Sequence, residues 1–139
     1  MDTLFGSVLE YYKFDLNLTP FQTLNSKGIN IISDDSLRLE IITVYEVWNR
    51  RLTFINNSEQ KLNEELLRPY YLNDFRNVNW SMNKIAIPKK FEEVLKDDYY
   101  VNILEYKLSL KIRNQRMWNS AQAQMMKLKE RIDKHFGEN

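Results

Sequence analysis

Few side chains in this sequence have the type and setting that acid–base or metal chemistry requires. The single histidine, His135, stands close to the C-terminus, where helices fray, and no orienting partner is visible beside it. Without a cysteine or a Glu-x-x-His motif, one histidine cannot form a typical zinc or di-iron site. We therefore expect His135 to be a surface residue, and we predict no catalytic residue, no metal ligand and no cofactor.

Adjacent acidic residues are the next candidates for catalysis. They occur at Asp34-Asp35, Glu64-Glu65, Glu92-Glu93 and Asp97-Asp98. Catalytic carboxylates face each other across a cleft, whereas neighbours in sequence point to different sides of a helix. The first and last pairs stand at expected helix starts, where capping and the helix dipole explain them. The other two fit solvated helix faces, so we interpret every pair as structural.

Aromatic residues could provide a stacking surface for a sugar or a base. The candidates are the doublets Tyr11-Tyr12, Tyr70-Tyr71 and Tyr99-Tyr100, together with Trp48, Trp80 and Trp118. In each doublet one ring can face the core while the other lies against solvent, which favours ordinary packing. A ligand-sensing bundle that binds a small molecule through Trp and Tyr side chains remains the alternative.

Glycine and proline are scarce, and this scarcity indicates which secondary structure holds the candidate residues named above. The 139 residues include three glycines and three prolines, too few for the many tight turns of a sandwich or barrel. The chain also lacks the Gly-rich loops that bind phosphates. Thr19 as N-cap with Pro20 after it starts a short helix, which Gly28 ends as its C′ residue.

The strongest periodicity predicts a long helix from about residue 34 to residue 68. Its apolar stripe comprises Leu37, Ile41, Val44, Trp48, Leu52, Ile55, Leu62 and Leu66. Glu59 is the one polar residue within the stripe. Asp34 can cap this helix and pair with Arg38 at i, i+4. Pro69 should kink or end it, because proline lacks an N–H and disfavours helix in the preceding residue.

A second long helix is predicted from about Asp98 to Phe136, with Gly137 as its terminator. Its apolar band comprises Val101, Leu104, Leu108, Ile112, Trp118, Met125, Ile132 and Phe136, flanked by Leu110, Met117, Ala121 and Leu128. Polar side chains at Lys111, Gln115 and Gln122 interrupt the band. Interruptions of this kind indicate a helix that meets solvent or another chain along part of its length.

Shorter segments complete the expected architecture. Residues 3–13 predict a short amphipathic helix, residues 75–88 a loop, and residues 88–96 a short helix. In the last of these, the inward side chains are expected to be Phe91, Val94 and Leu95. The fold class is therefore all-α: an elongated antiparallel helical bundle with two long helices and shorter N-terminal and connecting helices. We predict a single domain over residues 1–139.

Charge and hydropathy exclude several partner classes. The net charge of +1 lacks the clustered basic footprint of nucleic-acid binding, so we predict no nucleic-acid partner. No apolar run approaches the roughly 18 residues of a membrane span, and the N-terminus does not resemble a signal peptide. As given, the chain is expected to be soluble.

Residues 19–45 resemble a segment of an uncharacterised family of Bacteroidota membrane-anchored proteins. The matching positions are Thr19, Pro20, Leu24, Ser26, Gly28, Ile32, Leu37, Arg38, Ile41 and Tyr45. In that family a short cytoplasmic segment and one transmembrane helix usually precede this region, which lies outside the cytoplasm. The present chain departs from the pattern by lacking that helix. The resemblance brings no assigned activity and no catalytic residues.

The sequence therefore favours a non-enzymatic function. We expect an extracytoplasmic helical domain of a membrane-anchored protein, periplasmic or otherwise at the outer face of the inner membrane. Its expected role is protein interaction or self-association, with a membrane contact only through a span that this chain does not contain.

Overall fold

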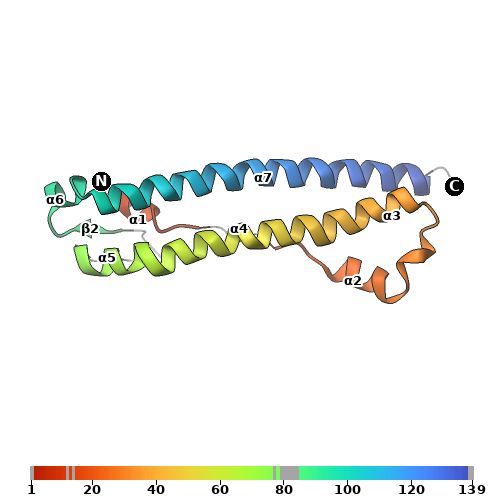
Figure 1. Ribbon diagram of the computed structural model, residues 1–139, viewed down its shortest axis with the longest axis horizontal. Coiled ribbons are helices and arrows are strands. Elements are labelled where there is room, and N and C mark those ends of the chain that lie inside the picture. Colours follow the sequence, from red (N-terminus) through yellow and green to blue (C-terminus); the bar gives the residue numbers. More distant parts are fainter. Residues whose placement is uncertain (1, 12, 14, 77, 79–84, 138–139) are drawn as a thin grey trace. The chain divides into compact units, whose positions relative to one another are not determined.

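The all-α class is confirmed by the computed structural model, which describes residues 2–11, 13, 15–76, 78 and 85–137 (Figure 1). In chain order the elements are α1 (Asp2–Ser7), α2 (Thr19–Ser26), the 3-10 turn η1 (Ile29–Ile31), α3 (Asp35–Ile42), the π-helical turn η2 (Thr43–Trp48), α4 (Asn49–Leu62), the π-helical turn η3 (Asn63–Leu67), α5 (Arg68–Asp74), β1 (Phe75–Arg76), β2 (Ile87–Pro88), α6 (Phe91–Leu95) and α7 (Asp98–Gly137). None of the helices within these ranges has an apolar stretch long enough to cross a membrane.

The chain folds into two compact units. Unit 1 comprises residues 1–13 and 55–112, and unit 2 comprises residues 14–54 and 113–139. Each unit therefore contains part of α4 and part of α7. Within each unit the two helices run antiparallel, as predicted, because later residues of one contact earlier residues of the other. The single domain over residues 1–139 stays a prediction.

The predicted cap at the start of the first long helix is confirmed. Asp34 has extended backbone, and its Oδ1 accepts a hydrogen bond from the N–H of Leu37 at 2.9 Å. This bond satisfies one of the N–H groups that the first helical turn leaves without a partner. The predicted partner of Asp34 was wrong, however, because Arg38 pairs with Asp35 instead.

Pro69 does not end this helix, which continues to Asp74. The π-helical turn η3 ends at Leu67, two residues before the proline, and explains the difference. A π-helical turn is wider than an α-helical one, so it can accommodate both the missing N–H and the proline ring. The helix ends at Phe75, whose backbone is extended with φ −119° and ψ 160°.

The short N-terminal helices differ in detail from the prediction. Thr19 is the first helical residue of α2 and not its N-cap. Its N–H donates a hydrogen bond to the side-chain oxygen of Asn17 at 3.1 Å. Gly28 has φ +90° as expected of a C′ glycine. The helix predicted over residues 3–13 ends at Ser7, whose hydroxyl donates to the carbonyl of Leu4.

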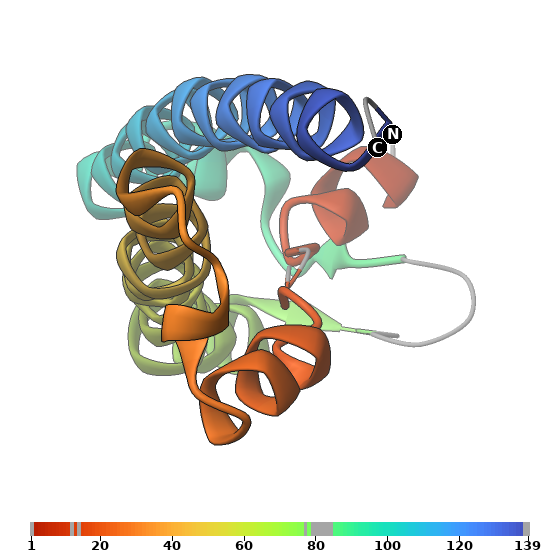
Figure 2. The same cartoon turned by 90° about the vertical axis from the view of Figure 1, so that its right-hand side faces the viewer.

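Two short strands lie in the stretch predicted to be a loop. β1 pairs antiparallel with β2, in the register Phe75 with Pro88 and Arg76 with Ile87. Pro88 therefore belongs to a strand, and α6 starts at Phe91. Strands of two residues show no periodicity, which is why the sequence pattern did not reveal them. Figure 2 shows α1 lying beside this pair of strands, all within unit 1.

The buried face of α7 differs from the predicted band. The buried residues are Tyr100, Ile103, Lys107, Leu110, Asn114, Ala121 and Leu128, which follow a heptad repeat. The predicted residues Val101, Leu108, Ile112 and Phe136 are exposed, so that part of the prediction was wrong. The predicted Trp118, Met125 and Ile132 are half-buried. The apolar band is wider than one helix contact can cover, and the partner helix decides which edge of it is buried.

Unit 2 has its own core, to which its segments of the two long helices contribute. Its buried apolar residues are Phe21, Ile32, Leu37, Ile41, Val44 and Leu128. The ring of Phe21 in α2 stacks on that of Tyr45 in η2, with centroids 5.1 Å apart. This contact fixes α2 against the first long helix, as expected for a short helix that covers a longer one.

Candidate functional site

A cluster of aromatic rings forms the core of unit 1. The Tyr71 ring stacks on Phe75 at 4.2 Å, and Tyr70 stacks on Tyr100 at 4.8 Å. The Tyr71 hydroxyl donates to the carbonyl of Phe5 at 2.9 Å and lies 2.7 Å from the Tyr100 hydroxyl. Burial raises the pKa of both Tyr71 and Tyr100, so these phenols stay protonated at neutral pH.

The tyrosine doublets follow the predicted inward–outward arrangement in one case and not in another. Tyr99 is exposed and Tyr100 buried, as predicted, but Tyr70 and Tyr71 are both buried. Rings packed into a core in this way cannot stack on a ligand. Tyr12 and Trp80 lie outside the described residues.

The tryptophans of unit 2 are engaged in packing. Trp48 is half-buried, and the guanidinium carbon of Arg51 lies 5.1 Å from the centroid of its ring. This cation–π contact occupies a face that a base or sugar would need. Trp118 is also half-buried and has its own contacts.

Charged side chains form a buried layer in unit 1 between the first long helix and α7. The Glu59 side chain is 3% exposed, with one carboxylate oxygen 2.5 Å from Lys111 Nζ and 4.0 Å from Lys107 Nζ. Lys107 donates to Oδ1 of Asn63 at 2.7 Å. Asn63 in turn donates to the carbonyl of Leu9 at 3.3 Å. The layer therefore links both long helices to the N-terminal segment.

The charge state of Lys107 is the unusual property of this layer. Burial lowers the pKa of Lys107 to about 8, although the nearby carboxylate of Glu59 opposes the shift. A lysine with such a pKa can act as a base or a nucleophile when substrate reaches it. Lys107 is 7% exposed, and it lines neither the hollow beside Tyr70 nor the one beside Tyr106. Its position fits a structural role.

One hollow of about 210 Å³ lies at the end of unit 1. Its lining residues are Tyr70, Asp74, Lys89, Lys90, Glu93, Val94 and Asp97. Asp97 accepts a hydrogen bond from the Tyr70 hydroxyl at 2.6 Å, which lowers the pKa of Asp97. Burial, followed by this hydrogen bond, raises the pKa of Tyr70. Lys90 contacts the carboxylate of Glu93 at 2.9 Å. Shifts in these directions leave neither Asp97 nor Tyr70 able to exchange protons near neutral pH.

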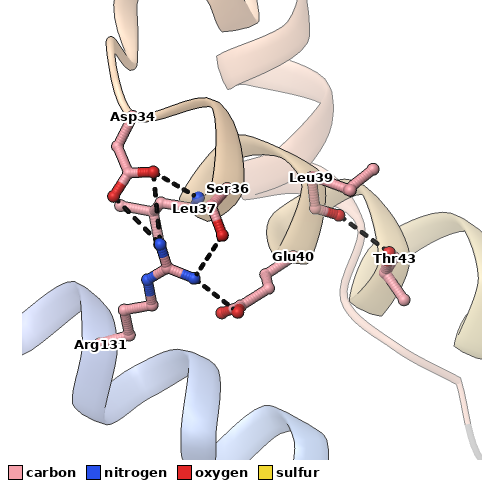
Figure 3. A network of polar contacts seen from close by, with 7 residues as sticks. All are labelled: Asp34, Ser36, Leu37, Leu39, Glu40, Thr43 and Arg131. Carbon is pink, nitrogen blue, oxygen red and sulfur yellow. Dashed lines mark hydrogen bonds and ion pairs between the residues drawn. The ribbon is translucent and has the colours of Figure 1, made fainter.

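A guanidinium clamp orders the start of α3 in unit 2 (Figure 3). Arg131 of α7 donates to Asp34 at 3.1 Å, to the Ser36 hydroxyl at 3.0 Å and to Glu40 at 2.5 Å. The hydrogen bond from the N–H of Leu37 holds the pKa of Asp34 below its usual value, and the hydrogen bond and charge of Arg131 lower it further. Every donor and acceptor in this clamp is a group of the helix start or of Arg131 itself, which indicates that the clamp positions helices.

The acidic pairs have the structural roles that we expected. Asp34 caps α3, and Asp97 caps α7 by accepting from the N–H groups of Tyr99 and Tyr100 at 2.9 and 3.4 Å. The remaining pairs are on the surface, where Glu65 contacts Lys61 at 3.8 Å. His135 packs edge-on against the ring of Phe136. Among the described residues, no three His, Asp or Glu side chains gather in a way that could hold a metal ion.

An apolar stripe on α7 is a feature of unit 1 that internal packing does not explain. Its members are Val101, Leu104, Leu108 and Ile112. Spacings of three and four place these residues on one helix face. Leu108 is 61% exposed and Ile112 46%, whereas Leu104 is half-buried against the unit 1 core. We call these four residues the α7 stripe.

Sequence reasoning missed the buried layer, although one signal for it was present. Glu59 interrupts an otherwise apolar stripe, and a polar residue inside such a stripe calls for a buried partner. The partner could not be identified, because Lys107 was not part of the apolar band predicted for its helix.

Neither a family model, nor a curated protein, nor a solved structure matches this chain. The resemblance of residues 19–45 to a Bacteroidota family therefore stays a prediction.

Proposed function

We propose that this chain is a non-enzymatic helical interaction domain that associates with a second copy of itself through the α7 stripe. The exposure of Leu108 and Ile112 carries this proposal. Large apolar side chains aligned along one helix face are typical of a contact surface. The polar groups described above serve caps, clamps and the buried layer, which supports an interaction role over catalysis.

A second copy is the partner that the stripe itself favours. In an isologous dimer the same surface patch meets itself, so one apolar stripe is sufficient. The charge of Lys111, the neighbour of Ile112, is compensated by Glu59. The exposed Glu105, four residues after Val101, lies at the edge of the stripe and limits the affinity. Burying the exposed part of Leu108 contributes about 1–2 kcal/mol. Since association itself costs several kcal/mol, we expect a weak, concentration-dependent dimer.

Light scattering and sedimentation equilibrium of the whole chain test this proposal. We expect a dimer at high concentration and a monomer for Leu108→Glu, because the variant places a charge in the α7 stripe. Asn102→Glu is the matched control, since it adds the same charge to an exposed position on the same helix outside the stripe. If the wild-type chain stays monomeric up to about 1 mM, self-association is excluded. This concentration is about the effective concentration that a short flexible tether provides, so a weaker contact would not form even between linked chains.

We also propose that the domain lies outside the cytoplasm, next to a membrane to which its parent protein is anchored. The resemblance of residues 19–45 supports this location. The gene that encodes the chain gives a direct test, since a transmembrane segment encoded upstream of residue 1 supports this location. A second test is to fuse the encoded protein to a reporter that is active only in the cytoplasm; an active fusion contradicts the proposal.

Small-molecule binding is the second candidate function, and the hollow beside Tyr70 favours it. Lysines and carboxylates both line this hollow, so a compact zwitterion such as an amino acid fits its chemistry. A thermal-shift screen against amino acids and sugars tests the idea. Stabilisation that disappears in Asp74→Ala supports binding, and no stabilisation by any compound counts against it.

A further inference from the structure

The first residues of the chain form an arm that packs on unit 1. We call residues 2–11 the N-terminal arm. The Phe5 side chain is buried, and its ring lies 5.3 Å from that of Phe75 and 6.2 Å from that of Phe91. Val8 and Leu9 pack at the edge of the same core. The apolar contact therefore rests on a few side chains.

Side chains of the first long helix hold the backbone of the N-terminal arm through hydrogen bonds. The Tyr71 hydroxyl donates to the carbonyl of Phe5, and the Asn63 amide donates to the carbonyl of Leu9. Both donors come from the first long helix, and their own positions are fixed by Tyr100 and Lys107. The described contacts of the arm thus come from residues 55–112, and this surface would accept the same arm from another chain.

The segment that follows the arm separates it from the next helix. Between Leu9 and Thr19 the described residues form neither helix nor strand. The arm belongs to unit 1, whereas α2 belongs to unit 2. A terminal segment that docks through side-chain contacts and is joined by irregular backbone has the arrangement from which domain swapping arises.

We propose that the N-terminal arm is exchangeable, so that in a dimer the arm of each copy docks on unit 1 of the other. The inference rests on the proposed self-association and deepens it. Leu104 connects the α7 stripe to unit 1, since it belongs to the stripe and packs against the same core as Val8 and Leu9. Contact through the α7 stripe would raise the effective concentration of the partner's arm toward that of the chain's own arm.

Crosslinking between two singly substituted chains tests the exchange directly. The chain has no cysteine, so each introduced thiol is unique. Chains carrying Leu9→Cys are mixed with chains carrying Asn63→Cys, incubated at dimer-forming concentration and treated with a short thiol crosslinker. Leu9→Cys mixed with Asn57→Cys is the matched control, because residue 57 is exposed on the same long helix. We expect a severalfold higher yield of covalent heterodimer from the first mixture than from the control.

Each outcome decides between exchange and its alternatives. If light scattering shows a dimer but heterodimer yields are equal, and a doubly substituted Leu9→Cys/Asn63→Cys chain crosslinks only within itself, the arm stays on its own chain and the inference is wrong. Self-association then still stands. If no dimer forms at any concentration, the proposed function fails and the exchange fails with it. Should Asn63→Cys lose helical circular dichroism, Leu66→Cys replaces it, since Leu66 packs on the same core.

Discussion

Lys107 donates to the side-chain oxygen of Asn63 across 2.7 Å inside the core of unit 1. This contact places an ammonium group where an antiparallel helix pair usually has an apolar residue. The ammonium also lies 4.0 Å from Glu59, and the amide of Asn63 extends the contact to the N-terminal arm. The stability of unit 1 should therefore depend on a small number of charged side chains.

Removing the buried carboxylate should destabilise the protein strongly. Glu59→Gln leaves Lys107 without its buried counter-ion, and breaking such a pair costs about 3–5 kcal/mol. Glu65→Gln is the matched control on the same helix, since the Glu65 side chain is 60% exposed beside Lys61; this change should cost less than about 1 kcal/mol. Urea unfolding followed by circular dichroism measures both. Equal effects of the two variants would show that the layer is not energetically special.

The stability of the protein should rise with pH above about 8. The pKa of Lys107 falls from 10.5 in the unfolded chain to about 8 in the fold. A lowered pKa means that the unfolded state binds more protons between these values, so each rise in pH favours the fold. Linkage gives an increase of about 2 kcal/mol in the free energy of unfolding between about pH 7.5 and about pH 9.5. Burial raises the pKa of Tyr71, which reverses the trend above pH 10.

Lys107→Met isolates this effect. Urea unfolding at the same two pH values should give nearly equal free energies for the variant, because the titrating group is gone while the apolar stem is preserved. A variant that keeps the full pH dependence of the wild type would assign the effect to another group.

Loss of one buried hydroxyl should weaken the attachment of the N-terminal arm. Tyr71→Phe leaves the carbonyl of Phe5 and the hydroxyl of Tyr100 without this partner, at a cost of about 1–3 kcal/mol. Tyr99→Phe removes an exposed hydroxyl and should change stability by less than about 0.5 kcal/mol. Hydrogen exchange of the arm amides, compared with those of α7, reports whether the loss is local. Unchanged exchange in the arm would contradict the proposed anchoring.

The helix start at Asp34 should be sensitive to acid. Because its pKa lies below the usual 3.8, Asp34 contributes stability that is present above that value and is lost as the pH falls through the lowered pKa. Asp34→Asn keeps a capping oxygen but loses the charge that faces Arg131. The variant should melt at a lower temperature than the wild type at pH 7, and the difference should shrink in acid. A difference that is independent of pH would show that the charge is irrelevant.

The ends of several elements could be predicted from local residues alone. Asp34 and Asp97 cap helices because a short acidic side chain reaches the N–H groups of the next turn. Gly28 adopts a positive φ because glycine has no Cβ. Of the two outcomes predicted for Pro69, a kink or an end, the end does not occur, because a π-helical turn compensates for the proline locally.

Sequence alone determined the helical class, the caps and the presence of an apolar band on α7, because these depend on neighbours within about one helical turn. Tertiary structure decided which edge of that band is buried, so that Tyr100 and Ile103 lie in the core while Leu108 is exposed. It also decided that Glu59 and Lys107 meet, since their contact joins two helices far apart in sequence. The α7 stripe and the buried layer follow from that choice of edge, which no local pattern specifies.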